Sequence, residues 1–170
     1  MSAGNSTTSP RLRENKTAIL SGCGPGLGRD TALALARHGA RVALLARSPS
    51  NLAAVARDLE ALGAEVITIQ ADITSTEDCK RAAVTVAKHW GTIDVLVNNA
   101  FALGETKAFL DTDIDADWRT PFEVNLFGTL RLSQQIARHM CIAGFGSIIM
   151  INTLPVRTPI ISNEFGAYAA

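Results

Sequence analysis

The 170-residue sequence has no run of like charges, no long apolar stretch and only three cysteines. Its 16 basic and 16 acidic residues are scattered and give a formal net charge of zero, which argues against nucleic-acid or membrane-surface binding. No apolar stretch reaches the roughly 20 residues that a membrane-spanning helix needs. An odd number of cysteines without paired spacing favours reduced thiols, so we expect a cytoplasmic protein. No cluster of His and Cys indicates a metal site.

A glycine-rich turn near the N-terminus is the most informative segment. An apolar run over residues 17–20 precedes it, and apolar spacing predicts a helix over residues 29–38 after it. A second apolar run over residues 41–46 completes a βαβ unit. The N-terminus of such a helix offers unpaired N–H groups and partial positive charge to phosphates. We therefore predict a dinucleotide site whose turn residues are Ser21, Gly22, Gly24, Gly26, Leu27 and Gly28.

Three of these glycines have distinct physical tasks. A sharp exit from the strand requires backbone angles that residues with a Cβ disfavour, and Gly22 supplies them. Gly26 and Gly28 leave room for a pyrophosphate and for close contact between helix and strand. An ordinary glycine-rich turn remains the alternative when this segment is considered alone.

Apolar runs and helical patterns alternate through the rest of the chain. Further strands are expected over residues 65–69, 93–97 and 147–151, and helices over residues 51–62, 76–90, 116–124 and 127–141. Residues 101–113 are expected to form a polar connection. The right-handed crossover rule then predicts an α/β fold, a Rossmann-like doubly wound parallel sheet with strand order 3-2-1-4-5. We assign residues 1–14 to a disordered tail and residues 15–170 to one nucleotide-binding domain.

The spacing [Ser/Thr]-Gly-x-x-x-Gly-x-Gly resembles that of the short-chain dehydrogenase/reductase family. Further matches follow in the family's order, in Ala71-Asp72-Ile73, Asn98-Asn99-Ala100, Asn125, Thr153 and Tyr168. The resemblance covers everything after about residue 15. It implies an oxidoreductase that transfers a hydride between a nicotinamide cofactor and the carbonyl or alcohol carbon of a small molecule.

The end of the second expected strand favours one cofactor over the other. NAD sites usually place a carboxylate there for the ribose 2′-hydroxyl, but this sequence reads Ala46-Arg47-Ser48 and has no acid before Asp58. Arg47 can pair with a 2′-phosphate through two hydrogen bonds, and Ser48 can add a hydroxyl. We therefore expect NADP(H) rather than NAD(H), unless Arg47 is only a solvated loop residue.

The resemblance assigns roles to residues that follow the third and fourth strands. It implies that Asp72 hydrogen-bonds the adenine edge and that Ile73 packs against the ring. It places Asn99 and Ala100 along the adenosine ribose. The family's usual Asn-Asn-Ala-Gly ends here in Phe101, whose ring should reshape the nearby pocket.

The resemblance also implies a catalytic set of Asn125, Thr153 and Tyr168. Tyr168 would handle the proton, Thr153 would replace the usual serine, and Asn125 would hold a helix kink and a relay water. The family's lysine would fall two positions beyond Ala170. A free tyrosine titrates near ~10, and the resemblance implies that this lysine lowers the pKa of the tyrosine. Without the lysine, alcohol oxidation should suffer most, because it needs the deprotonated tyrosine.

We expect the 170-residue chain to lack the family's last strands and helices. The edge formed by residues 148–151 would then be uncovered, and the chain would be poorly stable and nearly inactive. A homo-oligomer is implied for the full-length family fold but is not expected of this chain, because one of the two contact helices is missing. The alternatives to an oxidoreductase are a non-catalytic nucleotide-binding module and a non-functional fragment. The retained Asn125, Thr153 and Tyr168 favour the oxidoreductase.

Overall fold

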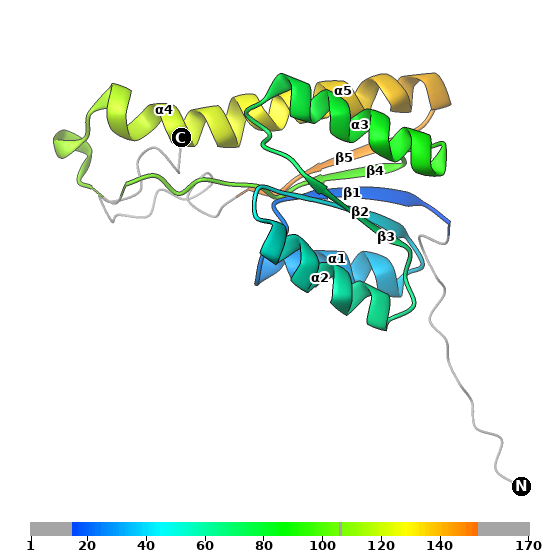
Figure 1. Ribbon diagram of the computed structural model, residues 1–170. Coiled ribbons are helices and arrows are strands. Elements are labelled where there is room, and N and C mark those ends of the chain that lie inside the picture. Colours follow the sequence, from blue (N-terminus) through cyan, green and yellow to red (C-terminus); the bar gives the residue numbers. More distant parts are fainter. Residues whose placement is uncertain (1–14, 106, 153–170) are drawn as a thin grey trace, which may run out of the picture.

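Five parallel strands form the centre of the computed structural model, which describes residues 15–105 and 107–152 (Figure 1). Their order in the sheet is β3-β2-β1-β4-β5, as the sequence predicted. Each adjacent pair is parallel. The strands are β1 (Thr17–Ser21), β2 (Arg41–Ala46), β3 (Val66–Gln70), β4 (Val95–Asn98) and β5 (Ser147–Met150).

Helices cover both faces of the sheet. Helices α1 (Leu27–Arg37) and α2 (Pro49–Ala61) lie on one face, and α3 (Thr76–Trp90) and α5 (Thr129–Ala143) lie on the other (Figure 1). This arrangement confirms the doubly wound fold. A short 3₁₀ turn, η1 (Phe109–Asp111), follows the loop after β4.

The alternation of side chains along each strand supplies both layers. Ile19 of β1 and Leu96 of β4 pack with α3 and α5. Their neighbours Leu20 and Val97 pack with α1 and α2 on the opposite face. All four side chains are at most 2% exposed, which is why the strand sequences are almost continuously apolar.

The predicted break between two helices near residue 125 is wrong. Helical structure runs without interruption through η2 (Ile114–Trp118), α4 (Arg119–Phe122), η3 (Glu123–Gly128) and α5, where η2 and η3 are wider π-helical turns. Asn125 does not cap a new helix, because its amide donates to the Ala102 carbonyl at 2.9 Å and accepts from the Ala102 N–H at 2.7 Å. The end of η3 lies close to the β3–α3 turn, since a Cβ on Gly128 would lie 2.8 Å from Ile73 Cγ1.

Helix α2 begins two residues earlier than predicted. Ser48 caps its N-terminus by accepting a hydrogen bond from the Asn51 N–H at 3.3 Å. Pro49 then occupies the first helical position, where its fixed φ and missing N–H carry little penalty. The cap places Ser48 directly after Arg47 at the end of β2.

Strand β5 forms an edge of the sheet within the described residues. The apolar residues Ile148, Ile149, Met150 and Ile151 are between 37% and 43% exposed, as expected for an uncovered edge. None of the helices described in residues 15–105 and 107–152 is long and apolar enough to cross a membrane.

The nearly buried carboxylate of Asp94, just before β4, ties together the amino-terminal ends of β1 and β4. It accepts hydrogen bonds from the Thr17 N–H at 2.9 Å and from Lys16 Nζ at 2.9 Å. Burial alone would raise the pKa of Asp94, but these donors together lower it below its usual value. The ionised carboxylate therefore stabilises the pairing of β1 with β4.

We expect Asp94→Asn to lower the free energy of unfolding by about 1–3 kcal/mol at pH 7, because hydrogen bonds to a charged group are lost. A lowered native pKa contributes stability above the unfolded value of ~3.9, and that contribution disappears as pH falls through the native pKa. Urea unfolding at pH 7 and pH 3 measures the difference in the free energy of unfolding between the unaltered protein and Asp94→Asn. This difference should be smaller at pH 3 than at pH 7. A difference of equal size at both pH values would contradict this role.

Candidate functional site

A cleft of about 580 Å³ lies at the carboxyl ends of β1, β2, β3 and β4. Ligands of doubly wound sheets bind at this edge, at the point where the strand order reverses. Here that point lies between β1 and β4, since β2 and β3 lie on one side of β1 and β4 and β5 on the other. Seven of the eleven predicted cofactor-binding residues line the cleft: Gly22, Gly24, Arg47, Asp72, Ile73, Asn99 and Ala100. The fold thus brings together residues separated by as much as 78 positions in sequence.

The turn after β1 touches the end of β4 at Gly22. Its φ is +77°, and a Cβ there would lie 2.5 Å from both the N and Cα atoms of Ala100. The Gly22 N–H donates to the Leu45 carbonyl at 2.9 Å, which ties the same turn to β2. Glycine is required here by backbone angle and by space at once.

Four predicted residues do not line the cleft, although they lie beside it. The buried Ser21 Oγ accepts the N–H groups of Asn99 at 3.2 Å and Ala100 at 3.3 Å, so it supports the floor of the cleft from below. A Cβ on Gly28 would lie 2.5 Å from the Gly22 carbonyl oxygen, so Gly28 lets α1 pack against the turn. Gly26 has a φ of +91° and open space around it, and Leu27 begins α1.

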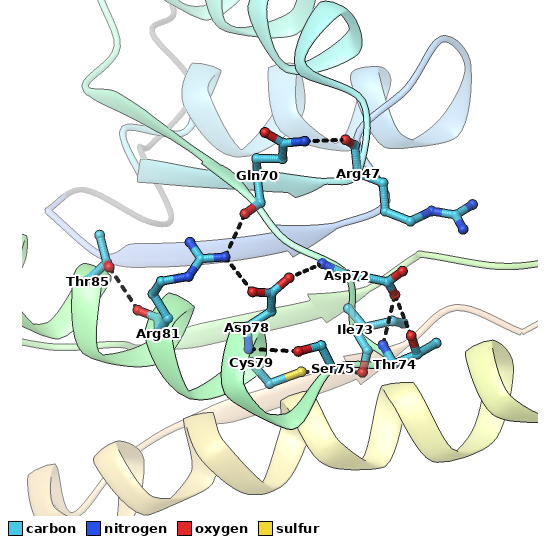
Figure 2. Close-up of polar contacts among 10 residues, drawn as sticks. All are labelled: Arg47, Gln70, Asp72, Ile73, Thr74, Ser75, Asp78, Cys79, Arg81 and Thr85. Carbon is cyan, nitrogen blue, oxygen red and sulfur yellow. Dashed lines mark hydrogen bonds and ion pairs between the residues drawn. The ribbon is translucent and has the colours of Figure 1, made fainter.

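Arg47 lies on the wall formed by the end of β2. Its carbonyl accepts a hydrogen bond from Gln70 Nε2 at 3.2 Å, while its guanidinium has no hydrogen bond or ion pair among the described residues. In Figure 2 the guanidinium extends away from the polar network of Gln70 and Arg81. Ser48 lines the cleft but uses its hydroxyl as the α2 cap and lies 2.8 Å from Ser50 Oγ.

Asp72 and Ile73 form the wall after β3. Asp72 Oδ1 accepts from the Thr74 N–H at 2.9 Å and from Thr74 Oγ1 at 2.8 Å (Figure 2). The Asp72 N–H donates to Asp78 Oδ2 at 2.9 Å. Ile73 is 7% exposed and presents an apolar surface at this side of the cleft.

Several lining residues were not predicted. Asn51 lies in the first turn of α2, and the Ser48-Pro49 cap was the sequence signal that could have located it. Phe101 lines the cleft and is 62% exposed, which agrees with the expectation that its ring alters the pocket. Three further apolar residues lie at or just after the ends of strands, Leu45, Ala46 and Ala71, and Val124 reaches the cleft from η3.

Cys23 also lines the cleft, but its chemistry is inert. Burial raises the pKa of its thiol to about 12, and the thiol donates to the Leu20 carbonyl at 3.3 Å. A protonated, buried thiol is a poor nucleophile. Cys23 therefore serves as a small packing residue.

The predicted catalytic set is described only in part. Asn125 does not line the cleft but holds the loop after β4 through its two bonds to Ala102. Thr153 and Tyr168 lie outside the described residues, as does the predicted tail of residues 1–14. Their roles stay predictions.

Comparisons with known proteins agree with this architecture. The family model described as short chain dehydrogenase matches residues 16–170. L-rhamnose 1-dehydrogenase (NAD(P)(+)) from Sphingomonas sp. (strain SKA58) is 33% identical over 146 residues, which cover 85% of this chain and 57% of the relative. The chain therefore spans little more than half the length of this curated relative.

Two solved structures have closely similar folds. NAD+-bound xylitol dehydrogenase superposes with a TM-score of 0.88 and 26% identity, covering 93% of this chain and 60% of that one. A 7α-hydroxysteroid dehydrogenase complexed with NADH and 7-oxo glycochenodeoxycholic acid has a TM-score of 0.85 and 31% identity, covering 94% and 60%.

We expect Gly22→Ala to destabilise the protein more than Gly63→Ala. Both glycines have similar positive φ values, +77° and +73°, but only at Gly22 would a Cβ meet backbone atoms. The shared left-handed conformation costs about 1–2 kcal/mol, and the clash adds to it at Gly22. Urea unfolding of the two variants measures the difference. Equal losses would show that the contact between Gly22 and Ala100 imposes no constraint.

Proposed function

Because the chain belongs to the short-chain dehydrogenase family, we propose that the protein is an oxidoreductase that uses NADP(H). It transfers a hydride between the nicotinamide and the carbonyl or alcohol carbon of a small molecule. The observation that carries this proposal is the cleft at the carboxyl edge, where seven residues expected at a dinucleotide line one cavity. Its volume of about 580 Å³ is in the range of small-molecule sites.

The chemistry of the lining residues fits a dinucleotide phosphate. The N-terminus of α1 follows Gly24 and Gly26, whose carbonyls accept the N–H groups of Arg29 and Asp30. The N–H groups of Leu27 and Gly28 have no hydrogen bond among the described residues, so they suit a pyrophosphate. The guanidinium of Arg47, which has no partner among the residues that the structure describes, suits a 2′-phosphate. Ile73 and Ala100 offer apolar contacts to a base and a ribose. When bound, the cofactor would supply or accept the hydride.

The chain's own residues would shape the cleft, orient the substrate and exchange a proton with its oxygen. Asn125 holds the loop after β4 in place through Ala102, directly beyond Phe101 on the cleft wall. We propose that Thr153 donates a hydrogen bond to the substrate oxygen and that Tyr168 exchanges its proton with that oxygen. Protonated Tyr168 serves carbonyl reduction, and deprotonated Tyr168 serves alcohol oxidation.

We favour NADP(H) over NAD(H) because of the residue that follows β2, Arg47. The relatives' names carry NAD(P)+, NAD+ and NADH, so membership of the family is compatible with either cofactor. At this chain's β2 end the exposed side chain is an arginine without a partner among the described residues. Asp72 is the acidic residue of the cleft lining, and it follows the neighbouring strand β3 rather than β2, where NAD sites usually carry their carboxylate. An arginine attracts a 2′-phosphate, and the 2′-hydroxyl of NADH offers it no charge to pair with.

We expect Arg47→Ala to weaken NADPH binding about tenfold to a hundredfold, because a charge-assisted pair with the 2′-phosphate is lost. Binding of NADH should change less than about threefold, since it carries no 2′-phosphate. Isothermal titration of both cofactors against both proteins measures the four affinities. Arg57→Ala is the control, because Arg57 is an exposed arginine of the following helix α2 that does not line the cleft.

Tighter binding of NADH than of NADPH by the unaltered protein would overturn the cofactor assignment. Consumption of NADPH with a panel of ketones and aldehydes tests the reaction itself. Binding without any turnover would favour the non-catalytic nucleotide-binding module, and absence of binding would contradict the whole proposal.

A further inference from the structure

An ion pair on α3 holds the wall of the cleft from outside. Asp78 Oδ2 accepts the Asp72 N–H at 2.9 Å, and Asp78 Oδ1 lies 2.6 Å from Arg81 Nη2. The same Arg81 nitrogen donates to the Gln70 carbonyl at 2.9 Å. Figure 2 shows these three bonds as one continuous network between α3 and the end of β3. None of the residues Gln70, Asp78 and Arg81 lines the cleft.

The network fixes the chain on both sides of the point where β3 leaves the sheet. Gln70 is the last residue of β3, and Asp72 is the lining residue two positions later. Asp78 is itself held, because its N–H donates to the Ser75 hydroxyl that caps α3, at 3.2 Å. The capped first turn of α3 is thereby coupled to the backbone of Asp72.

The carboxylate of Asp72 is left partly available by this arrangement. Its Oδ1 accepts both bonds from Thr74, whereas its Oδ2 has no hydrogen bond among the described residues. With the backbone N–H held by Asp78 and Oδ1 held by Thr74, the direction of Oδ2 is set by the protein. An oxygen held in this way is suited to accept from an amino group of a bound base.

The negative charge of Asp78 strengthens its hydrogen bond with the Asp72 N–H. The Asp72 N–H, followed by Arg81, lowers the pKa of Asp78, so its carboxylate is ionised at neutral pH. The side chains of Asp78 and Arg81 are 31% and 48% exposed. Ion pairs this exposed contribute little to folding, because solvent screens the two charges. The network therefore matters more for where Asp72 lies than for overall stability.

We propose that Asp78 is a positioning residue that aims Asp72 at the 6-amino group of adenine and so sets the preference of the cleft for an adenine nucleotide. This inference rests on the proposed function, since it needs a dinucleotide in the cleft. It assigns no contact between Asp78 and the ligand. Asp78 acts through the Asp72 backbone alone.

The test compares NADPH with its hypoxanthine analogue, in which an oxygen replaces the 6-amino group. The unaltered protein should bind NADPH about tenfold more tightly than the analogue, as expected for one hydrogen bond to a charged group. In Asp78→Ala this preference should fall to about twofold or less, because Asp72 Oδ2 is no longer aimed. Asp78→Asn keeps an acceptor for the Asp72 N–H and should recover part of the preference.

Asp115→Ala is the matched control. Asp115 also pairs with an arginine of its own helical segment, Arg119, and both side chains are 75% exposed. Its removal deletes one acidic charge and one ion pair away from the cleft, so the preference should stay near tenfold. Circular dichroism checks that each variant is folded. If Asp78→Ala does not fold, Arg81→Ala is measured instead, and it too should lower the preference.

The outcomes separate this inference from the proposed function. Failure of the unaltered protein to bind either nucleotide would contradict the proposed function. Tight binding of NADPH with an unchanged preference in Asp78→Ala would overturn the positioning role and leave the proposed function intact. Equal binding of NADPH and the analogue by the unaltered protein would also overturn it.

Discussion

The backbone contact between Gly22 and Ala100 is the constraint on which the rest of the site depends. No side-chain atom fits between the turn after β1 and the end of β4, and Gly22 adopts the positive φ that the contact requires. Ser21 and Asn99 reinforce it, since Ser21 Oγ accepts two N–H groups and Asn99 Nδ2 donates to the Gly22 carbonyl at 2.9 Å. The contact aligns two strand ends that would otherwise diverge.

The sheet carries this alignment outward to the other walls of the cleft. Leu45 accepts from the Gly22 N–H, so the end of β2 and its Arg47 follow the turn. On the far side, α3 fixes the exit from β3 through Asp78. Four loops that differ in sequence therefore meet at one edge because each is tied to the parallel strand or helix beside it. A dinucleotide would span all four.

The sequence predicted the strand order and most of the cleft for a common physical reason. Buried parallel strands are apolar on both faces, and the residues after their carboxyl ends must converge, so Gly22, Arg47, Asp72 and Ala100 could be located together. The prediction failed where a distant partner decides the outcome. The sequence predicted two helices on either side of Asn125, but its amide pairs with the backbone of Ala102 and helical structure continues through it. The role of Asp78 was missed because it depends on the three-dimensional path of the β3–α3 turn.

The most direct test of the account is an NMR titration of the ¹⁵N-labelled protein with NADPH, followed through backbone amide shifts. We predict that the largest shifts occur at Gly22, Gly24, Arg47, Asp72 and Ala100, the residues from four strand ends that line the cleft. Amides of the helical run around Ile114 and Trp118 should shift little. Large shifts confined to that run, with the glycine-rich turn unaffected, would contradict the assignment of the cleft as the cofactor site.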